Sequence, residues 1–95
     1  MRIPVSVCMS YKTANIKGLV DSGATDNFIH PTFMQRMGLG TRSLKQPRKI
    51  WNMDNSENKA GCITHYVTLN VQTKGIQVDM NFLVMDIRNE DVLLG

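Results

Sequence analysis

The chain has 95 residues, of which 42% are hydrophobic and 20% charged, with a net charge of +3. These values favour a single globular domain, residues 1–95, with a modest core over a disordered tail. No apolar run approaches the roughly 20 residues that span a bilayer, and the N-terminus has no apolar signal-peptide core, so an intracellular, cytoplasmic setting without membrane contact is expected.

The first part of the chain predicts a β-hairpin over residues 3–21. Apolar and polar residues alternate at its start, so that Ile3, Val5 and Val7 fall on one face of a strand. A turn is expected at residues 13–15, and residues 16–20 predict a second strand that ends at Asp21.

One short helix is predicted after this hairpin, within residues 30–40. Pro31 suits the first helical turn, and Gly38 is a natural stop just past the end. Met34 and Met37 share a helical face and are expected to fill the core.

The second half of the chain predicts further strands. Residues 48–53 look extended, 54–61 form a polar turn, and 62–72 are the longest β-rich run. After a turn at 73–75, residues 76–86 return with strict period-two alternation, and 91–95 are a last apolar run. Six or seven strands with one short helix predict a small all-β sandwich or barrel.

The two cysteines, Cys8 and Cys62, are expected to be free, buried thiols. A metal site built from these cysteines with His30 and His65 is disfavoured, because no pair has the close spacing of zinc motifs. Neither a metal nor another cofactor is expected.

Four of the eleven basic residues fall between residues 42 and 49, a stretch that contains no acid. Such a cluster suits either a site for nucleic acid or an acidic substrate, or a solvated basic loop. The stretch has no aromatic residue for base stacking, so the loop is favoured and nucleic acid is not an expected partner.

Asp21 is the most informative residue. Composition alone favours a turn or cap carboxylate, because Asp is poor inside strands. However, Asp21 follows an apolar strand and precedes Ser22-Gly23-Ala24, where small residues let another group come close and Gly23 permits unusual backbone angles. A partly buried carboxylate in such surroundings is typical of a functional site.

The sequence "LVDSGAT" followed by "DNFI" resembles the active-site stretch of retropepsin-type aspartic proteases, and is most similar to those of gypsy-type long-terminal-repeat retrotransposons. The family's second landmark, two apolar residues and a glycine, is matched by Leu93-Leu94-Gly95. Residues 49–67 lie where the family has a flap hairpin over its substrate. The resemblance covers nearly the whole chain and implies a retropepsin-like closed barrel with one short helix.

The resemblance implies an aspartic endopeptidase that cleaves peptide bonds with an Asp-activated water and processes a Gag-Pol-type polyprotein. Two carboxylates that share one proton perform this chemistry. The chain has one Asp-Ser-Gly, so a homodimer in which each copy supplies Asp21 is required. The chain stops at Gly95, before the C-terminal helix and segment of relatives, which predicts a weak dimer or a trimmed domain.

The resemblance also implies individual roles. Asp21, Ser22 and Gly23 are the catalytic residues: Ser22 bonds across the dimer in relatives, and the Gly23 carbonyl accepts from bound peptide. The substrate-binding residues are Ala24, Asp26, Trp51 and Met53. The alternatives are a local turn bond for Ser22, a simple exposed acid at Asp26 and a half-buried core side chain at Trp51. His30 and His65 are expected to be structural.

Two other functions remain open from the sequence. The chain could be a retropepsin-fold binding or dimerisation module without activity of its own. It could also be a basic β-domain that binds nucleic acid through residues 42–49, with Asp21 as a turn residue.

Overall fold

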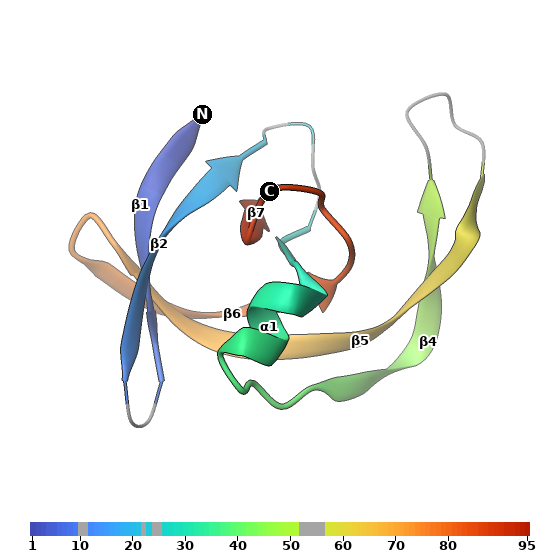
Figure 1. The fold of residues 1–95 in the computed structure, drawn as a ribbon, viewed down its shortest axis with the longest axis horizontal. Helices are drawn as coiled ribbons and strands as arrows, with labels where there is room; N and C mark the ends of the chain where they lie inside the picture. Colours follow the sequence, from blue (N-terminus) through green and yellow to red (C-terminus); the bar gives the residue numbers. More distant parts are fainter. Residues whose placement is uncertain (10–11, 22, 24–25, 52–56) are drawn as a thin grey trace.

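The computed structural model describes residues 1–9, 12–21, 23, 26–51 and 57–95, and for residues 50–51 and 57–61 it describes the backbone alone. Within these residues the chain forms seven strands and one helix (Figure 1). The strands are β1 (Arg2–Cys8), β2 (Thr13–Val20), β3 (Phe28–Ile29), β4 (Arg42–Trp51), β5 (Glu57–Thr73), β6 (Ile76–Val84) and β7 (Val92–Leu94), and the helix is α1 (Pro31–Arg36).

Six of the strands close into a barrel. Their order is β1-β2-β7-β3-β6-β5, and β1 completes the ring by pairing antiparallel with β5, where Val7 lies opposite Val71. β4 is added outside the ring, next to β5, and the β4–β5 hairpin extends from the barrel on the right of Figure 1. The predicted fold class, a small all-β closed barrel with one short helix and an extending hairpin, is confirmed.

Apolar side chains at alternating strand positions fill the barrel, because successive residues of a strand point to opposite faces. Val5 and Val7 are 3% and 1% exposed, so the predicted inner face of the first strand is confirmed. Met34 and Met37 pack against the edge of the core, also as predicted. The core cluster consists of Val5, Val7, Ile29, Phe33, Val67, Leu69, Val71, Phe82 and Val92.

The first hairpin forms as predicted, but its turn lies elsewhere. β1 and β2 pair antiparallel from Arg2 opposite Leu19 to Cys8 opposite Thr13. The turn therefore lies between residues 8 and 13, where the Met9 N–H donates to the Lys12 carbonyl at 2.8 Å, and the prediction of a turn at 13–15 is wrong. Every residue of β1 has a partner on β2, and this pairing extends β2 back to Thr13, a β-branched residue that suits a strand.

The predicted helix is confirmed. His30 is its N-cap, Pro31 opens it, and Gly38 follows the C-cap with φ of 68°, a left-handed value that glycine adopts readily. Phe33 is 2% exposed and anchors the helix in the core. Across the described ranges, no helix is both long and apolar enough to cross a membrane.

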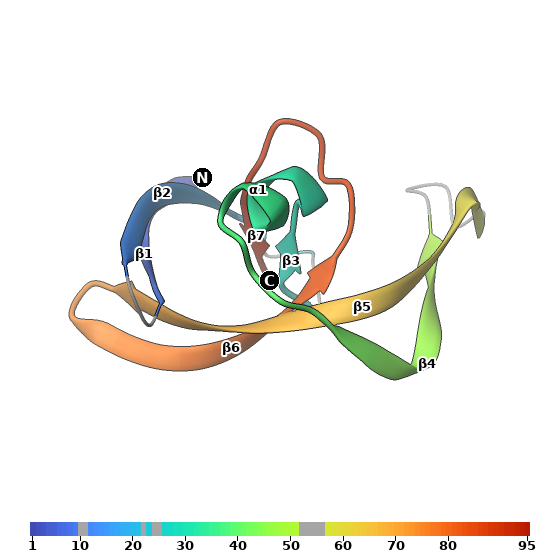
Figure 2. The same cartoon turned by 60° about the horizontal axis from the view of Figure 1, so that its bottom comes forward.

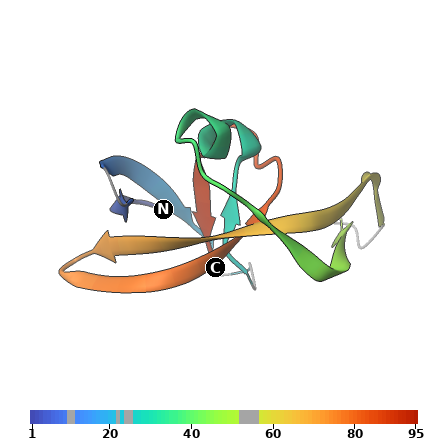
Figure 3. The ribbon, with the colours of Figure 1, turned by 90° about the horizontal axis from the view of Figure 1, so that it is seen from below.

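β5 is the longest element and belongs to both the barrel and the extending hairpin (Figures 2 and 3). Residues 57–61, expected as part of a polar turn, continue this strand because they pair back toward β4, with Glu57 opposite Trp51. The turn predicted at 73–75 is confirmed: Lys74 and Gly75 both have positive φ, at 51° and 79°.

Both cysteines are free, as predicted, but they are not both buried. Cys8 is half-buried and Cys62 is exposed. Cys62 lies where β5 has left the barrel and pairs with Lys49 of β4, so the core does not cover it. Among the described residues, no three His, Cys, Asp or Glu side chains gather closely enough to hold a metal ion.

Candidate active site

Asp21 comes directly after β2 and lies beside β7. Its backbone N–H donates to the carbonyl oxygen of Leu94 at 2.9 Å and extends the parallel β2–β7 pairing by one bond. Its side chain is exposed, and Oδ1 accepts a hydrogen bond from the backbone N–H of Gly23 at 2.9 Å. The loop backbone thus orients the carboxylate while presenting it at the surface.

The expectation of a partly buried carboxylate is wrong for the single chain. Asp21 lies one residue beyond Val20, the end of β2, where the chain leaves the barrel. Gly23 is also exposed, and a side chain there would begin 3.4 Å from Asp21 Oδ1. Both described residues of the motif, Asp21 and Gly23, are therefore exposed to solvent.

The second landmark of the sequence, Leu93-Leu94-Gly95, lies directly against the Asp21 loop. β7 is inserted between β2 and β3 (Figure 1). It runs parallel to β2, with Leu94 beside Val20, and antiparallel to β3, with Leu93 opposite Phe28. The two motifs, some seventy residues apart in sequence, thus meet at the ends of two adjacent strands, β2 and β7.

Asn27 is a residue of this site that the sequence analysis missed. Its side-chain Oδ1 accepts from the backbone N–H of Gly95 at 3.1 Å, and its Nδ2 donates to the carbonyl of Asn81 at 3.4 Å. Its own carbonyl accepts from the N–H of Leu83 at 2.9 Å. The only sequence signal was an amide residue placed between a polar loop and the apolar pair that starts β3.

Asp26 lies on the same loop and forms an ion pair with Arg48 of β4, at 2.7 Å between Oδ2 and Nη2. Hydrogen bonding to Asp26 raises the pKa of Arg48 above its ordinary value, and the carboxylate charge adds to this. The pair connects the Asp21 loop to the extending hairpin. It borders a cavity of about 220 Å³ lined by Asp26, Leu44, Arg48, Tyr66, Asn81 and Leu83.

The basic stretch 42–49 is mostly exposed to solvent, as expected, but it is a strand and not a loop. It belongs to β4, and its pairing with β5 shifts register between Ser43 and Arg48. The local sequence suggested a loop because Pro47 and several charges interrupt the apolar alternation. Pairing with β5 keeps the segment extended despite them, and a bulge accommodates the extra residues.

The structure describes the two strands of the hairpin that was expected to form the flap. β4 and β5 pair antiparallel up to Trp51 opposite Glu57. Trp51 ends β4, but its side chain is outside the description, and the tip residue Met53 lies outside the described residues altogether. Ser22 and Ala24, which flank Gly23, also lie outside them.

The hydrogen bonds of both histidines are to residues other than Asp21. His30 caps α1: its Nδ1 accepts from the Thr32 N–H at 3.0 Å, which leaves Nε2 to donate to Asp86 at 3.2 Å. His65 lies on β5 beside Thr64, 2.7 Å from its hydroxyl. These contacts give His30 a structural part in starting the helix.

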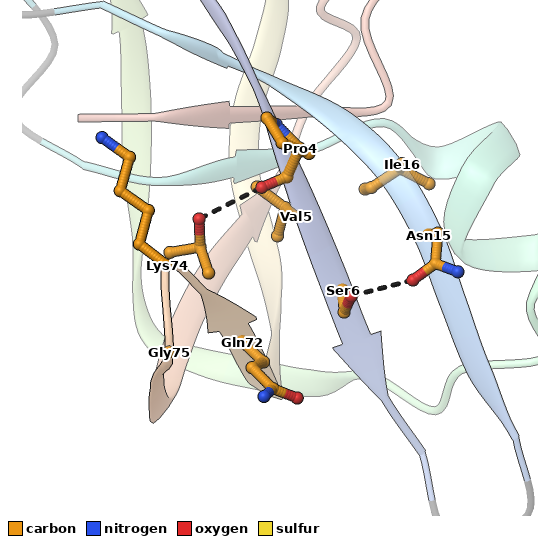
Figure 4. A pocket seen from close by; sticks show the side chains of 9 residues that line it. Pro4, Val5, Ser6, Asn15, Ile16, Gln72, Lys74 and Gly75 are labelled. Atoms are coloured by element: carbon orange, nitrogen blue, oxygen red, sulfur yellow. Dashed lines mark hydrogen bonds between the residues drawn. The ribbon is translucent and has the colours of Figure 1, made fainter.

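A larger hollow of about 380 Å³ lies at the other end of β2 (Figure 4). It is bordered by β1, β2 and the β5–β6 turn, where the Thr73 hydroxyl donates to the Pro4 carbonyl at 3.1 Å. Its nearest lining residue on β2, Ile16, is five residues before Asp21, or about 17 Å along a strand. This hollow therefore does not belong to the Asp21 site.

Comparison with known proteins agrees with this geometry. Residues 17–95 match a family described as the PEG10/RTL1 protease domain, so the match includes the second half of β2, the Asp21 loop, the hairpin and β7. No curated protein matches the chain. The chain belongs to the PEG10/RTL1 protease domain family, retropepsin-like domains derived from the Gag-Pol polyprotein of gypsy-type long-terminal-repeat retrotransposons.

Proposed function

We propose that the chain is an aspartic endopeptidase in which Asp21 activates a water molecule for peptide-bond hydrolysis. The observation that carries the proposal is the exposed Asp21 carboxylate, held by the Gly23 N–H beside Leu94 of β7 in a protease-domain family. By the same resemblance, its natural substrate is a Gag-Pol-type polyprotein.

Hydrolysis by this chemistry needs a second carboxylate. Each of the other described aspartates has a partner elsewhere. These pairs are Asp26 with Arg48, Asp79 with Asn70, Asp86 with His30, and Asp91 with Arg36. We therefore assign the second carboxylate to Asp21 of a second copy, in a homodimer with a two-fold axis.

Two such carboxylates act as one unit. Two unit charges about 4 Å apart repel by roughly 4 kcal/mol at an effective dielectric near 20. At about 1.4 kcal/mol for each pKa unit, this separates the two proton losses of such a pair by about three units. The pair therefore holds one proton over a wide acidic range: the ionised member takes a proton from water, and the protonated member donates to the carbonyl oxygen.

The substrate would lie between the Asp21 loop and the β4–β5 hairpin. By the resemblance, the Gly23 carbonyl, Ala24 and Asp26 would contact the peptide from the loop segment of the chain. Trp51 and Met53 would contact it from the hairpin segment. The Asp26–Arg48 ion pair supports this arrangement, because it joins the loop to β4 of the hairpin. A side chain of the peptide would enter the cavity of about 220 Å³ beside that pair.

A peptide-library cleavage assay between about pH 4 and 7 tests the proposal, comparing the parent chain with Asp21→Asn. The amide can neither accept the proton of water nor share one, so hydrolysis should disappear while the fold remains. Asp79→Asn is the matched control, because Asp79 is an exposed aspartate on β6 that hydrogen-bonds to Asn70. It should keep full activity.

Two results would contradict the proposal. Cleavage by Asp21→Asn within about tenfold of the parent would make Asp21 structural. A parent chain that dimerises at micromolar concentration in sedimentation, binds peptide and cleaves nothing would instead support a binding or dimerisation module.

A further inference from the structure

We propose that Asn27 is a positioning residue for Asp21, an inference that rests on the proposed function. Asp21 and Asn27 are the two ends of the loop that carries the active-site motif. The last peptide of the β7 motif, between Leu94 and Gly95, lies between them. Its carbonyl accepts from the Asp21 N–H at 2.9 Å, and its N–H donates to Asn27 Oδ1 at 3.1 Å.

This peptide acts as a rigid spacer between the two ends of the loop. The described residues have no cis peptide bonds, and a trans peptide is planar, with its C=O and N–H pointing to opposite sides. One side therefore faces Asp21 and the other faces Asn27. With both bonds made, the separation of the loop ends is set by a unit that does not bend.

Asn27 is itself fixed from the other side by β6. Its Nδ2 donates to the Asn81 carbonyl, and its backbone carbonyl accepts from the Leu83 N–H. An amide side chain carries both a donor and an acceptor, and here the two ends of one amide are used on different strands. The side chain thus joins β7 to β6 at the point where the loop rejoins the barrel.

The consequence for catalysis is positional. Asp21 lies in a loop outside the barrel, so its place relative to the second carboxylate depends on how the loop is held. Without the Asn27 side chain, Asp21 keeps its bond to Leu94, but the far end of the loop loses its bond to Gly95. A displacement of about 1 Å at a catalytic group can lower a rate about 100-fold.

The test compares Asn27→Ala, Asn27→Asp and the parent in steady-state cleavage. Asn27→Ala removes both side-chain bonds, and kcat should fall about 10- to 100-fold with KM within about threefold. Asn27→Asp keeps an acceptor for the Gly95 N–H, and at its own pH optimum kcat should recover to within about threefold of the parent. Asn15→Ala truncates an exposed asparagine on β2 whose partner is Ser6, and should change neither constant.

Amide hydrogen exchange provides a measurement that needs no activity, and its first part needs only the parent chain. In the parent chain, the Gly95 amide should exchange more slowly than an unbonded amide, and Asn27→Ala should speed its exchange while leaving the core amides of β5 protected. Fast exchange at Gly95 in the parent overturns the proposal, even where Asn27→Ala does not fold. Unchanged kcat in a folded Asn27→Ala overturns it as well.

A different result would contradict the proposed function than would contradict the positioning role of Asn27. If Asp21→Asn still cleaves, the aspartic mechanism is wrong whatever Asn27 does. If Asp21→Asn is inactive and Asn27→Ala is fully active, the mechanism stands and the positioning role is wrong.

Discussion

Replacing Gly18 with alanine tests how closely β1, β2 and β7 pack beside Asp21. Gly18 is buried on β2, and a Cβ at this position would lie 3.2 Å from Val92 Cγ2 and 3.3 Å from both Leu94 Cδ1 and Val5 Cγ2. Carbon atoms normally approach to about 3.5–4.0 Å. Val92 and Val5 are 1% and 3% exposed, so neighbours on all sides resist their displacement.

The expected free-energy change is a difference of two terms. An added methyl group in a packed core costs about 1–3 kcal/mol, whereas alanine is favoured over glycine inside a strand by about 0.5–1 kcal/mol. The crowding term is the larger one here, because three core methyl groups lie too close at once. A net loss of about 1 kcal/mol lowers the unfolding midpoint of a domain of this size by about 4–8 °C.

Thermal unfolding followed by circular dichroism, at one fixed protein concentration, measures this change. Gly40→Ala is the control, because a Cβ at Gly40 would meet nothing within 4 Å. Its midpoint should stay the same or rise slightly, since alanine restricts the unfolded chain. If Gly18→Ala unfolds at or above the parent's midpoint, the close packing of β7 against β2 is refuted.

Three further predictions concern assembly and charge. Below the dimer dissociation constant, the cleavage rate should rise with the square of the chain concentration. An excess of Asp21→Asn chain should inhibit the parent, because mixed dimers form. A rate strictly proportional to concentration, without inhibition by the variant, would indicate a monomeric catalyst. A hydrogen bond from the backbone N–H of Arg88, together with the interaction with His30, lowers the pKa of Asp86 below its ordinary value of 3.8. The ionised Asp86 therefore stabilises the folded state above pH 3.8, and this stabilisation is lost as the pH falls through the lowered pKa. Asp86→Asn should therefore lower the unfolding midpoint at about pH 6, and the deficit should shrink toward about pH 2; an equal deficit at both would contradict the assignment. Arg48→Gln should raise KM for peptides with little change in kcat. It should lower the free energy of unfolding by about 0–1 kcal/mol, because the ion pair is partly exposed. A large loss of kcat with normal KM would contradict the placement of this pair beside the substrate.

Local patterns in the sequence determined most of the elements. Alternation at Val5 and Val7 identified the inner face of β1, and Pro31 and Gly38 bounded the helix. The succession of short strands indicated a small all-β fold, and the Asp21 and Leu93-Leu94-Gly95 motifs identified the family. All of these are properties of neighbouring residues, which is why the sequence alone revealed them.

Only the tertiary structure decided where distant residues meet. The Gly95 N–H donates to the Asn27 side chain, 68 positions away in sequence, and the residues around Asn27 do not predict that bond. Arg48 appeared to belong to a basic loop until pairing with β5 placed it on a strand opposite Ile63 and beside Asp26. Cys62 looked like a core thiol, and Asp21 like a partly buried acid, but both lie where the chain has left the barrel. Burial and hydrogen bonding at such positions depend on how the closed barrel brings remote strands together, and local alternation carries no information on that arrangement.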